Sequence, residues 1–147
     1  MKNELMDTLS EHNRLGISQQ FDHSKFSLYF LITQSTAIEG STLTEVENQL
    51  LFDEGIPPKK RNLSEVLMNL DLHNAYQLSI RFAKQHRDYS LTMLRELSTA
   101  VLKNTGSRYS TALGSFDSSK GDFRKVNVSA GSSDKSYISC SKVEDWL

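Results

Sequence analysis

Residues 24 to 40, with the sequence SKFSLYFLITQSTAIEG, decide the fold. The stretch predicts a helix, because Ser24 can cap its first turn and Gly40 stands where a C-terminal glycine belongs. Its apolar side chains are Phe26, Leu28, Tyr29, Phe30, Leu31 and Ile32. They lie nearly all the way round the predicted helix, which is typical of a helix buried at the centre of a domain. We therefore expect the rest of the chain to pack around it.

A shorter helix is expected on either side of this central one. Residues 3 to 15 give a weak amphipathic helix that ends near the first glycine, because their apolar positions are sparse among charges. Thr44 with Glu47 offers a capping box for a helix that Gly55 closes. The two prolines after it force an extended turn, and its basic run, residues 59 to 61, is expected to keep a loop in solution.

Two further helices are expected after this turn. Asn62 and Glu65 make a start for a long helix that reaches about His86 and carries apolar side chains around most of its circumference. Ser90 caps the next helix, in which a single apolar stripe marks a surface position. The stripe consists of Leu91, Leu94, Leu97, Val101 and Leu102. The long helix needs packing partners on several sides, whereas the second lies at the surface.

The composition changes after residue 105, where glycine and serine become frequent and irregular chain is expected. Two short β-prone runs, residues 125 to 129 and 137 to 140, are joined by residues 131 to 135 and predict a β-hairpin. Because two strands alone are marginal in water, the pair must lean on the helices or on a partner. Ser141 with Glu144 is a capping box that predicts the start of a further helix.

With 147 residues the chain suits one compact domain. The fold class that we expect is mainly α, a helical bundle with a β-hairpin. Its parts are the region of the central helix at 24–56, a helical core at 62–104, the loop and hairpin at 105–140, and the start of a truncated helix at 141–147.

Charge and cysteine content argue against several classes of protein. The chain has 17 basic and 18 acidic residues, a net charge of -1, which gives no global reason for binding to nucleic acid or to an anionic membrane. The single Cys140 cannot form an internal disulfide, and no apolar run approaches the roughly 20 residues that span a bilayer. We expect a cytoplasmic protein with neither nucleic acid nor membrane as a partner.

Two common kinds of site are also absent from the sequence pattern. The sequence contains no Gly-x-Gly, and it matches neither the dinucleotide-binding fingerprint nor the P-loop motif. The histidines lie more than four residues apart with no cysteine pair beside them, so we expect no metal site and a structural role for each. They are His12, His23, His73 and His86.

The segment Ser35-Thr36-Ala37-Ile38-Glu39-Gly40 carries the clearest indication of function. Ser35 and Glu39 are four residues apart and share one face of a helix. Glu39 lies in the last turn, where the helix dipole disfavours an anion by roughly 0.3–1 kcal/mol, so a cation is expected nearby. In the plainer alternative, Gly40 simply caps the helix and Glu39 is solvated.

Together with the residues C-terminal to it, this segment resembles the N-terminal half of a Fic-family protein. The family's inhibitory helix carries (S/T)xxxE(G/N), which Ser35, Glu39 and Gly40 match. Further similarities occur in family order over about residues 24 to 147. In the helical part they are Ser41 to Thr44, Leu50-Leu51, Asp71 to Ala75 (a permuted form of the family's Asn-His-x-x-Ala) and Arg95-Glu96-Leu97. After the helices they are the Gly-x-Phe-Arg of Gly121 to Arg124, the flap hairpin at Val126 to Val128 and Tyr137 to Ser139, and the helix start at Ser141 to Leu147. The ordered combination implies a helical Fic-like bundle with a β-hairpin flap.

The resemblance implies an activity whose catalytic motif this sequence lacks. Fic proteins transfer AMP from ATP, with Mg²⁺, to a hydroxyl group of a target protein through the motif HxFx(D/E)GNGRxxR. The chain contains no such motif, and by family order it is expected just after Leu147. The resemblance therefore implies no catalytic residue, no metal and no cofactor in this chain, which we expect to be inactive by itself.

By resemblance, Glu39 pairs with the second arginine of the missing motif and blocks the seat of the ATP γ-phosphate, with Ser35 supporting the helix. The flap holds a segment of the target protein by adding a backbone strand. The flap residues are Val126, Asn127, Val128 and Ser129. Arg124 has two open roles, an approach to the nucleotide or a salt bridge that holds the flap. For the flap itself, a plain hairpin that covers the helices is the alternative.

Three functions remain open. The first is the inhibitory and flap part of a Fic-type protein adenylyltransferase, with a target protein or the catalytic half as its partner. The second is a standalone, non-catalytic module that docks a separate Fic catalytic chain through Glu39 and inhibits it. The third is an ordinary interaction domain. If a missing half normally packs on the long helix, the chain alone exposes an apolar patch and tends to self-associate.

Overall fold

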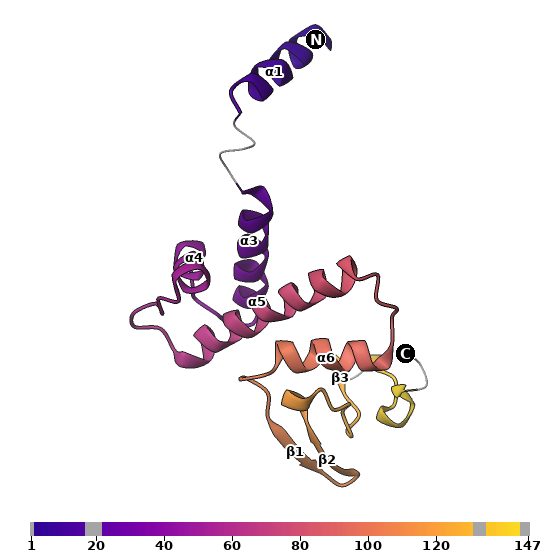
Figure 1. Ribbon diagram of the computed structural model, residues 1–147. Coiled ribbons are helices and arrows are strands. Elements are labelled where there is room, and N and C mark those ends of the chain that lie inside the picture. The colour runs from indigo at the N-terminus through magenta and orange to yellow at the C-terminus, as the bar shows by residue number, and fades with distance from the viewer. Residues whose placement is uncertain (1, 17–21, 131–134, 145–147) are drawn as a thin grey trace.

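The computed structural model describes residues 2–16, 22–130 and 135–144. Within these ranges the protein is mainly α-helical, and two small antiparallel hairpins come after the helices (Figure 1). This arrangement confirms the fold class expected from the sequence, a mainly α protein with a β-hairpin.

The helices begin and end close to the predicted residues. α1 spans Lys2–Arg14, α3 His23–Ile38, α4 Glu45–Glu54, α5 Leu63–Lys84 and α6 Leu91–Val101. Three predicted N-caps are confirmed, since Thr44, Asn62 and Ser90 each accept a backbone N–H of the first turn. Thr44 and Glu47 form the reciprocal bonds of a capping box, and Gly55 ends α4 in the left-handed conformation.

The predicted N-cap of α3 is wrong. The cap is Asp22 rather than Ser24, and Asp22 Oδ1 accepts the N–H of Lys25 at 2.9 Å. A carboxylate at the start of a helix gains both the cap bond and a favourable interaction with the helix dipole, whereas a serine hydroxyl gains the first alone.

The centre of the protein is α5 rather than α3. α3 and α4 contact one side of α5, and α6 contacts the other (Figure 1). α3 therefore buries one face, with Ile32, Thr33 and Thr36, and leaves Phe30 46% exposed. The prediction of a helix buried all round is wrong, because the described neighbours of α3 lie on one of its sides. The apolar core consists of Leu43, Leu51 and Val66, with Phe52 and Leu70 packed against it.

The basic run after α4 does more than keep a loop in solution. Arg61 donates from Nε and one terminal nitrogen to the two carboxylate oxygens of Glu47, at 2.9 and 2.8 Å. The Arg61 guanidinium, with the N–H of Thr44, lowers the pKa of Glu47 to about 2. This bidentate pair joins the connection between α4 and α5 to the first turn of α4, so the expectation of a solvated residue is wrong for Arg61, whereas Lys59 and Lys60 are exposed.

A β-hairpin that the sequence analysis did not predict comes after α6. β1 (Arg108–Thr111) pairs antiparallel with β2 (Gly114–Asp117), in a register that places Tyr109 opposite Phe116. The two rings stack with their centroids 4.9 Å apart. A cross-strand aromatic pair contributes up to about 1 kcal/mol to a hairpin. The short 3-10 helix after β2, η1 (Ser118–Lys120), packs against α6 and ties this hairpin to the helices.

Within the described residues, the predicted capping box of Ser141 and Glu144 is not formed. The short 3-10 helix η2 (Cys140–Lys142) begins without a side-chain cap bond. Glu144 instead accepts a hydrogen bond from Arg95 of α6 at 2.7 Å, which draws the last described residues against α6. The remainder of the predicted helix, residues 145–147, lies outside the described residues.

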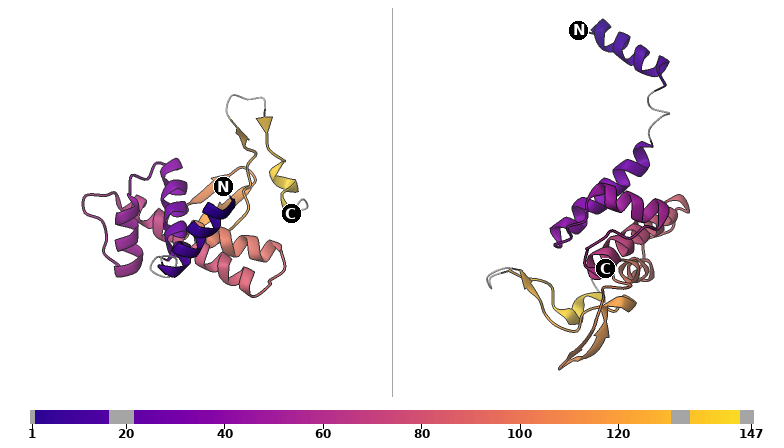
Figure 2. Two further views of the ribbon diagram at one scale, coloured as in Figure 1. Left: turned by 90° about the horizontal axis from the view of Figure 1, so that it is seen from above. Right: turned by 90° about the vertical axis from the view of Figure 1, so that its left-hand side faces the viewer.

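α1 lies apart from the other described elements (Figures 1 and 2). It confirms the predicted amphipathic helix, and its apolar side chains are exposed, with Leu5 at 70% and Leu9 at 52%. Of the helices that the structure describes, α1 included, none has the length and apolar character needed to cross a membrane.

Asp71 of α5 holds the end of α6. Its side chain is fully buried. Its two carboxylate oxygens accept the backbone N–H of Asn104 at 2.7 Å and the Asn104 side-chain amide at 2.6 Å. Asn104 lies just beyond α6, in the turn that leads to the first hairpin. Because a buried carboxylate is costly unless it accepts hydrogen bonds, this clamp fixes α6 against α5.

We predict that Asp71→Ala lowers the free energy of unfolding by about 2–3 kcal/mol, because it removes two hydrogen bonds to a carboxylate and leaves buried donors without a partner. Urea denaturation monitored by circular dichroism measures the change. Asn104→Ala is the matched control, since it removes the side-chain bond and keeps the backbone bond, and it should cost about half as much. Equal losses in the two variants would contradict the role given to the backbone bond.

Candidate functional site

The C-terminal turn of α3 fixes the backbone on both sides of Glu39. Glu39 is the C-cap residue, with φ −87°, and Gly40 after it has φ +94°. Such a positive φ is readily accessible to glycine and, at some cost, to asparagine. The N–H groups of Gly40 and Ser41 donate to the carbonyls of Ala37 and Thr36, at 3.0 and 2.9 Å. Backbone conformation therefore accounts for the glycine at position 40.

Glu39 contributes to the wall of a mainly apolar hollow of about 490 Å³, the Glu39 groove. The groove lies where the last turns of α3 meet α5 and the end of α6. Its lining residues are Ser35, Thr36, Glu39, Met68, Leu72, Val101, Leu102 and Thr105. Ser35 is half-buried and Glu39 is exposed. The two side chains thus share the face of α3 that their spacing predicts, and that face meets the groove.

Within the described part of the chain, Glu39 takes part in no salt bridge. Salt bridges are made by other acids, among them Glu11, Glu47, Asp53, Glu96 and Glu144. Glu39 also stands at the carbonyl end of α3, where the helix dipole opposes a negative charge by roughly 0.3–1 kcal/mol. The cation that the position calls for is therefore not supplied by the described residues.

The predicted flap forms a shorter β-ladder than expected. β3 (Ser129–Ala130) pairs with β4 (Lys135–Ser136), whereas the predicted strands covered residues 125–129 and 137–140. The residues that join β3 to β4, 131–134, lie outside the described residues. The prediction is wrong for most of the two runs, although the runs do lie side by side.

Side chains take the place of ladder bonds along the rest of the flap. The N–H of Tyr137 still donates to the carbonyl of Val128 at 3.0 Å. Three residues after Tyr137, the N–H of Cys140 donates to the side chain of Asn127, at Oδ1, at 2.8 Å. Because the Asn127 side chain captures a backbone donor that a strand would use, regular pairing stops there.

Arg124 joins the two runs of the flap through their backbone. Its guanidinium donates to the carbonyl of Val126 at 2.8 Å and to the carbonyl of Ile138 at 2.6 Å. Of the two roles that the sequence left open, Arg124 thus holds the flap, although its acceptors are carbonyl oxygens rather than a salt-bridge partner. An approach to the nucleotide stays a prediction.

The segment that leads into the flap lies directly on α6. Gly121 is buried with φ +69°, and a Cβ atom there would clash with the Arg95 carbonyl oxygen. Two residues on, the Phe123 ring lies under the Arg95 guanidinium at 4.6 Å. The glycine of the Gly-x-Phe-Arg pattern is therefore required by close backbone contact, and α6 anchors the flap.

The structure does not place the two predicted functional elements in one hollow. The Glu39 groove is lined from α3, α5 and the end of α6, and Val126 to Ser129 are not among its lining residues. Val126 and Val128 are 43% and 40% exposed, and Asn127 and Ser129 are exposed as well. The flap residues are thus accessible to a partner on their own surface.

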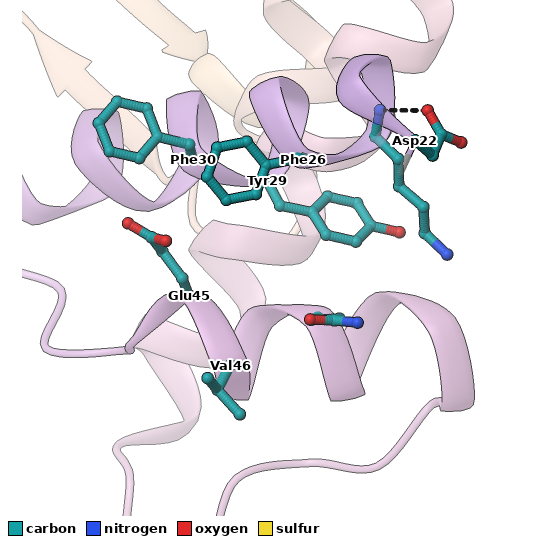
Figure 3. A pocket seen from close by; sticks show the side chains of 8 residues that line it. Asp22, Phe26, Tyr29, Phe30, Glu45 and Val46 are labelled. Atoms are coloured by element: carbon teal, nitrogen blue, oxygen red, sulfur yellow. Dashed lines mark hydrogen bonds between the residues drawn. The ribbon is translucent and has the colours of Figure 1, made fainter. Parts of the chain in front are cut away.

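A second hollow of about 420 Å³, the Phe30 groove, lies between α3 and α4. Figure 3 shows the aromatic side chains of α3 on one side of it and Glu45 and Val46 of α4 on the other. Its lining residues are Asp22, Lys25, Phe26, Tyr29, Phe30, Glu45, Val46 and Gln49. We assign it no ligand.

Three rings pack at the inner end of the Phe30 groove. Phe52 and His73 stack with centroids 4.3 Å apart, and Tyr29 meets both rings edge-on. The Tyr29 hydroxyl donates to Asp53 at 2.5 Å, and Lys25 Nζ lies 2.7 Å from the same carboxylate. Burial, helped by Asp53, raises the pKa of Tyr29 above its ordinary range. The cluster joins α3, α4 and α5, which makes His73 a structural residue.

Among the described residues, no three or more His, Cys, Asp or Glu side chains lie together as a metal site requires.

The residues that sequence analysis missed are buried polar ones. Asn48, Asn69 and Asp71 are fully buried, and their partners lie on other elements. A signal was present in residues 66–75, VLMNLDLHNA, where Asn69 and Asp71 interrupt an apolar run on a helix that needs neighbours. Polar residues in such a run predict buried hydrogen bonds, although the partners cannot be read from the sequence.

Comparison with known proteins gave no match: no family model, no curated protein and no solved structure is similar to the chain. The residues and their geometry are therefore the basis for any proposal about function.

We predict that His73 makes the protein less stable as the pH falls. Burial lowers the pKa of His73, and the charge of Asp53 opposes this shift only in part. Because the pKa is lower in the folded state, the stabilisation is complete above the unfolded value of about 6.5 and is lost as the pH falls towards the folded value. The free energy of unfolding, measured in urea between about pH 7.5 and 5.5, should therefore decrease.

His73→Leu removes this titration and should flatten the pH dependence, whatever its effect on stability at pH 7.5. His86→Asn is the matched control, because His86 is exposed and has a positive φ that asparagine tolerates. A slope that is unchanged in His73→Leu would show that another group causes it.

Proposed function

We propose that the chain is the inhibitory and flap part of a Fic-type protein adenylyltransferase, an enzyme that transfers AMP from ATP to a hydroxyl side chain of a target protein. Glu39 is the inhibitory residue, and Ser35 and Gly40 belong to the turn that presents it. Val126 to Ser129 dock the target protein. The chain contributes no catalytic residue and works with a polypeptide that carries HxFx(D/E)GNGRxxR.

The placement of Glu39 carries the proposal. Its carboxylate is exposed beside an apolar groove, has no salt bridge within the described part of the chain, and stands against the helix dipole. A partner that fills the groove with apolar side chains and brings a guanidinium to its edge would complement all three features. An arginine placed after a glycine-rich phosphate-binding turn is such a group.

Exposed apolar side chains beside the groove support the same partner surface. Ile38, which precedes Glu39, is 84% exposed, and Val101 in the wall of the groove is 37% exposed. Single exposed apolar residues are ordinary, and these two support the proposal because one precedes Glu39 in the sequence and the other lines the same groove.

The flap supports the second half of the proposal. Arg124 holds the base of the flap through backbone carbonyls, while the side chains of Val126 and Val128 stay exposed. Only part of this run is paired in a β-ladder. A short extended run with limited pairing can accept a further backbone strand from a target protein.

The first test asks where the catalytic motif is encoded. Sequencing the DNA beyond the codon for Leu147 should show HxFx(D/E)GNGRxxR in frame or one frameshift away. The purified 147-residue chain, incubated with α-labelled ATP, should transfer no AMP. Transfer by the pure chain would contradict the proposal. A catalytic Fic chain encoded in a neighbouring gene, and inhibited on addition of this chain, would support the standalone module instead.

We predict that Glu39→Gly raises AMP transfer in the protein that joins this chain to its catalytic part. Removing the carboxylate frees the arginine that seats the γ-phosphate, so the rate of self-modification or target modification should rise roughly 5- to 150-fold, the usual range of a coupling between two sites. Incorporation of label from α-labelled ATP measures the rate.

Two further variants sharpen this comparison. Glu39→Gln keeps the size of the side chain and removes its charge, so it should activate nearly as much. Glu54→Gln changes an exposed acid on α4 outside the groove and should leave the rate unchanged. If ATP still binds and neither Glu39 variant changes the rate, Glu39 has no inhibitory role.

A further inference from the structure

Asn69, on α5, is bonded to residues on both sides of Glu39. Its side chain is fully buried. Its Oδ1 accepts the Thr36 hydroxyl at 2.8 Å, and its Nδ2 donates to the Ser41 hydroxyl at 2.9 Å. Thr36 lies three residues before Glu39 and Ser41 two residues after it. The Asn69 side-chain amide therefore holds the turn that presents the proposed inhibitory residue through one residue before it and one after it.

The same amide also ties in two further elements. Asn69 Oδ1 accepts a second hydrogen bond from Asn48 Nδ2 of α4 at 2.9 Å, and Asn69 Nδ2 donates to the Glu65 carbonyl at 2.9 Å. Asn48 Nδ2 in turn reaches the Thr33 hydroxyl of α3 at 2.9 Å. All four hydrogen-bonding sites of the Asn69 amide are thus occupied.

The backbone next to Glu39 depends on the two residues that Asn69 holds. The Thr36 carbonyl accepts the N–H groups of Glu39 and Ser41, at 3.1 and 2.9 Å. Movement of Thr36 relative to α5 would therefore move the Glu39 backbone with it. Apolar contacts tolerate sliding, whereas hydrogen bonds fix both the height and the rotation of a helix, since both depend on direction.

The network also carries a cost that packing alone would avoid. Among the described residues, Asn48 Oδ1 is buried without a hydrogen-bond partner. Such an unpaired buried atom is destabilising, and replacing a whole buried polar group by well-packed apolar side chains is often neutral or stabilising. A polar crossing that costs stability but fixes a register is expected where the register has a function.

We infer that Asn69 is a positioning residue: it sets where α3 presents Glu39 to the partner arginine and so determines whether the chain can inhibit. This inference rests on the proposed function. Asn69 touches neither Glu39 nor the reacting atoms, and acts through the Thr36 and Ser41 hydroxyls. Loosening the network should therefore release the enzyme as the loss of the Glu39 carboxylate does.

The first experiment uses the 147-residue chain alone and measures amide hydrogen exchange by NMR. In Asn69→Leu, which keeps the size of the side chain, the Glu39, Gly40 and Ser41 amides should exchange about tenfold faster, a factor that corresponds to about 1.4 kcal/mol. Amides at the centre of α6 should be unchanged. Unchanged exchange at the three turn amides would overturn the positioning role.

Milder variants keep the test decisive if Asn69→Leu fails to fold. Thr36→Val and Ser41→Ala each remove one hydroxyl partner of Asn69, and each should speed exchange at the turn several-fold. Ser79→Ala is the matched control, because it removes only a hydroxyl bond to the Ala75 carbonyl within α5. If Ser79→Ala has the same effect at the turn, the response is general loosening and the inference fails.

The second experiment measures AMP transfer in the protein that carries the catalytic part. Thr36→Val and Asn69→Leu should raise the rate when Glu39 is present and should change it less than twofold in the Glu39→Gly background, because they act through that carboxylate. A merely structural role would lower the rate in both backgrounds, and that result would overturn the inference.

The two experiments distinguish failure of the proposed function from failure of the positioning role of Asn69. If Glu39→Gly itself leaves the rate unchanged, the proposed function fails, and the exchange data alone then decide whether Asn69 positions the turn. If Glu39→Gly activates but Thr36→Val and Asn69→Leu do not, the proposed function stands and the positioning role fails.

Discussion

The crossing of α3, α4 and α5 is held by buried hydrogen bonds as much as by apolar contact. The described part of the chain buries as many polar or charged residues as apolar ones: Thr33, Thr36, Ser41, Asn48, Asn69 and Asp71 against Ile32, Leu43, Leu51, Val66, Ala75 and Phe82. Apolar packing is non-directional, whereas hydrogen bonds also depend on the direction between donor and acceptor. The directional bonds of Asn69 and the clamp from Asp71 therefore decide where α3 and α6 stand on α5.

The hydrogen bonds of Asn69 and those of Asp71 both hold elements that line the Glu39 groove. Asn69 fixes the helix end that carries Glu39, and Asp71 fixes the turn after α6, which supplies Leu102 and Thr105 to the opposite wall. Two side chains of α5 thus hold the neighbouring segments that line the groove. Two residues beside the groove go against local preference. Glu39 places a negative charge at the C-terminal end of α3, and Ile38 before it is exposed to water. Departures from local preference of this kind are expected at functional sites, in keeping with the role proposed for Glu39.

The range of each interaction decides whether the sequence could predict it. Caps such as Thr44 with Glu47, and Ser90, were found because a helix end is decided within four residues. The Asn69 network joins residues up to 33 positions apart, and no local pattern names such a partner. The β1–β2 hairpin was missed because serines and a glycine surround its one aromatic pair and hide the alternation of a strand. The flap was placed correctly along the chain, but side chains interrupt its ladder.

For the inhibition proposed above, distance explains why the position of the Glu39 backbone matters as well as the charge of its side chain. Near a protein surface, opposite charges 4 Å apart attract by about 4 kcal/mol and charges 8 Å apart by about 2 kcal/mol, before desolvation is subtracted. A glutamate side chain can reach that far by rotation alone, so an inhibitory ion pair selects one place only if the backbone beneath it is held. A buried amide on another helix supplies this support. In the function proposed above, the inhibitory residue, Glu39 at the C-cap of α3, and the residue that positions it, Asn69 on α5, therefore lie on different elements.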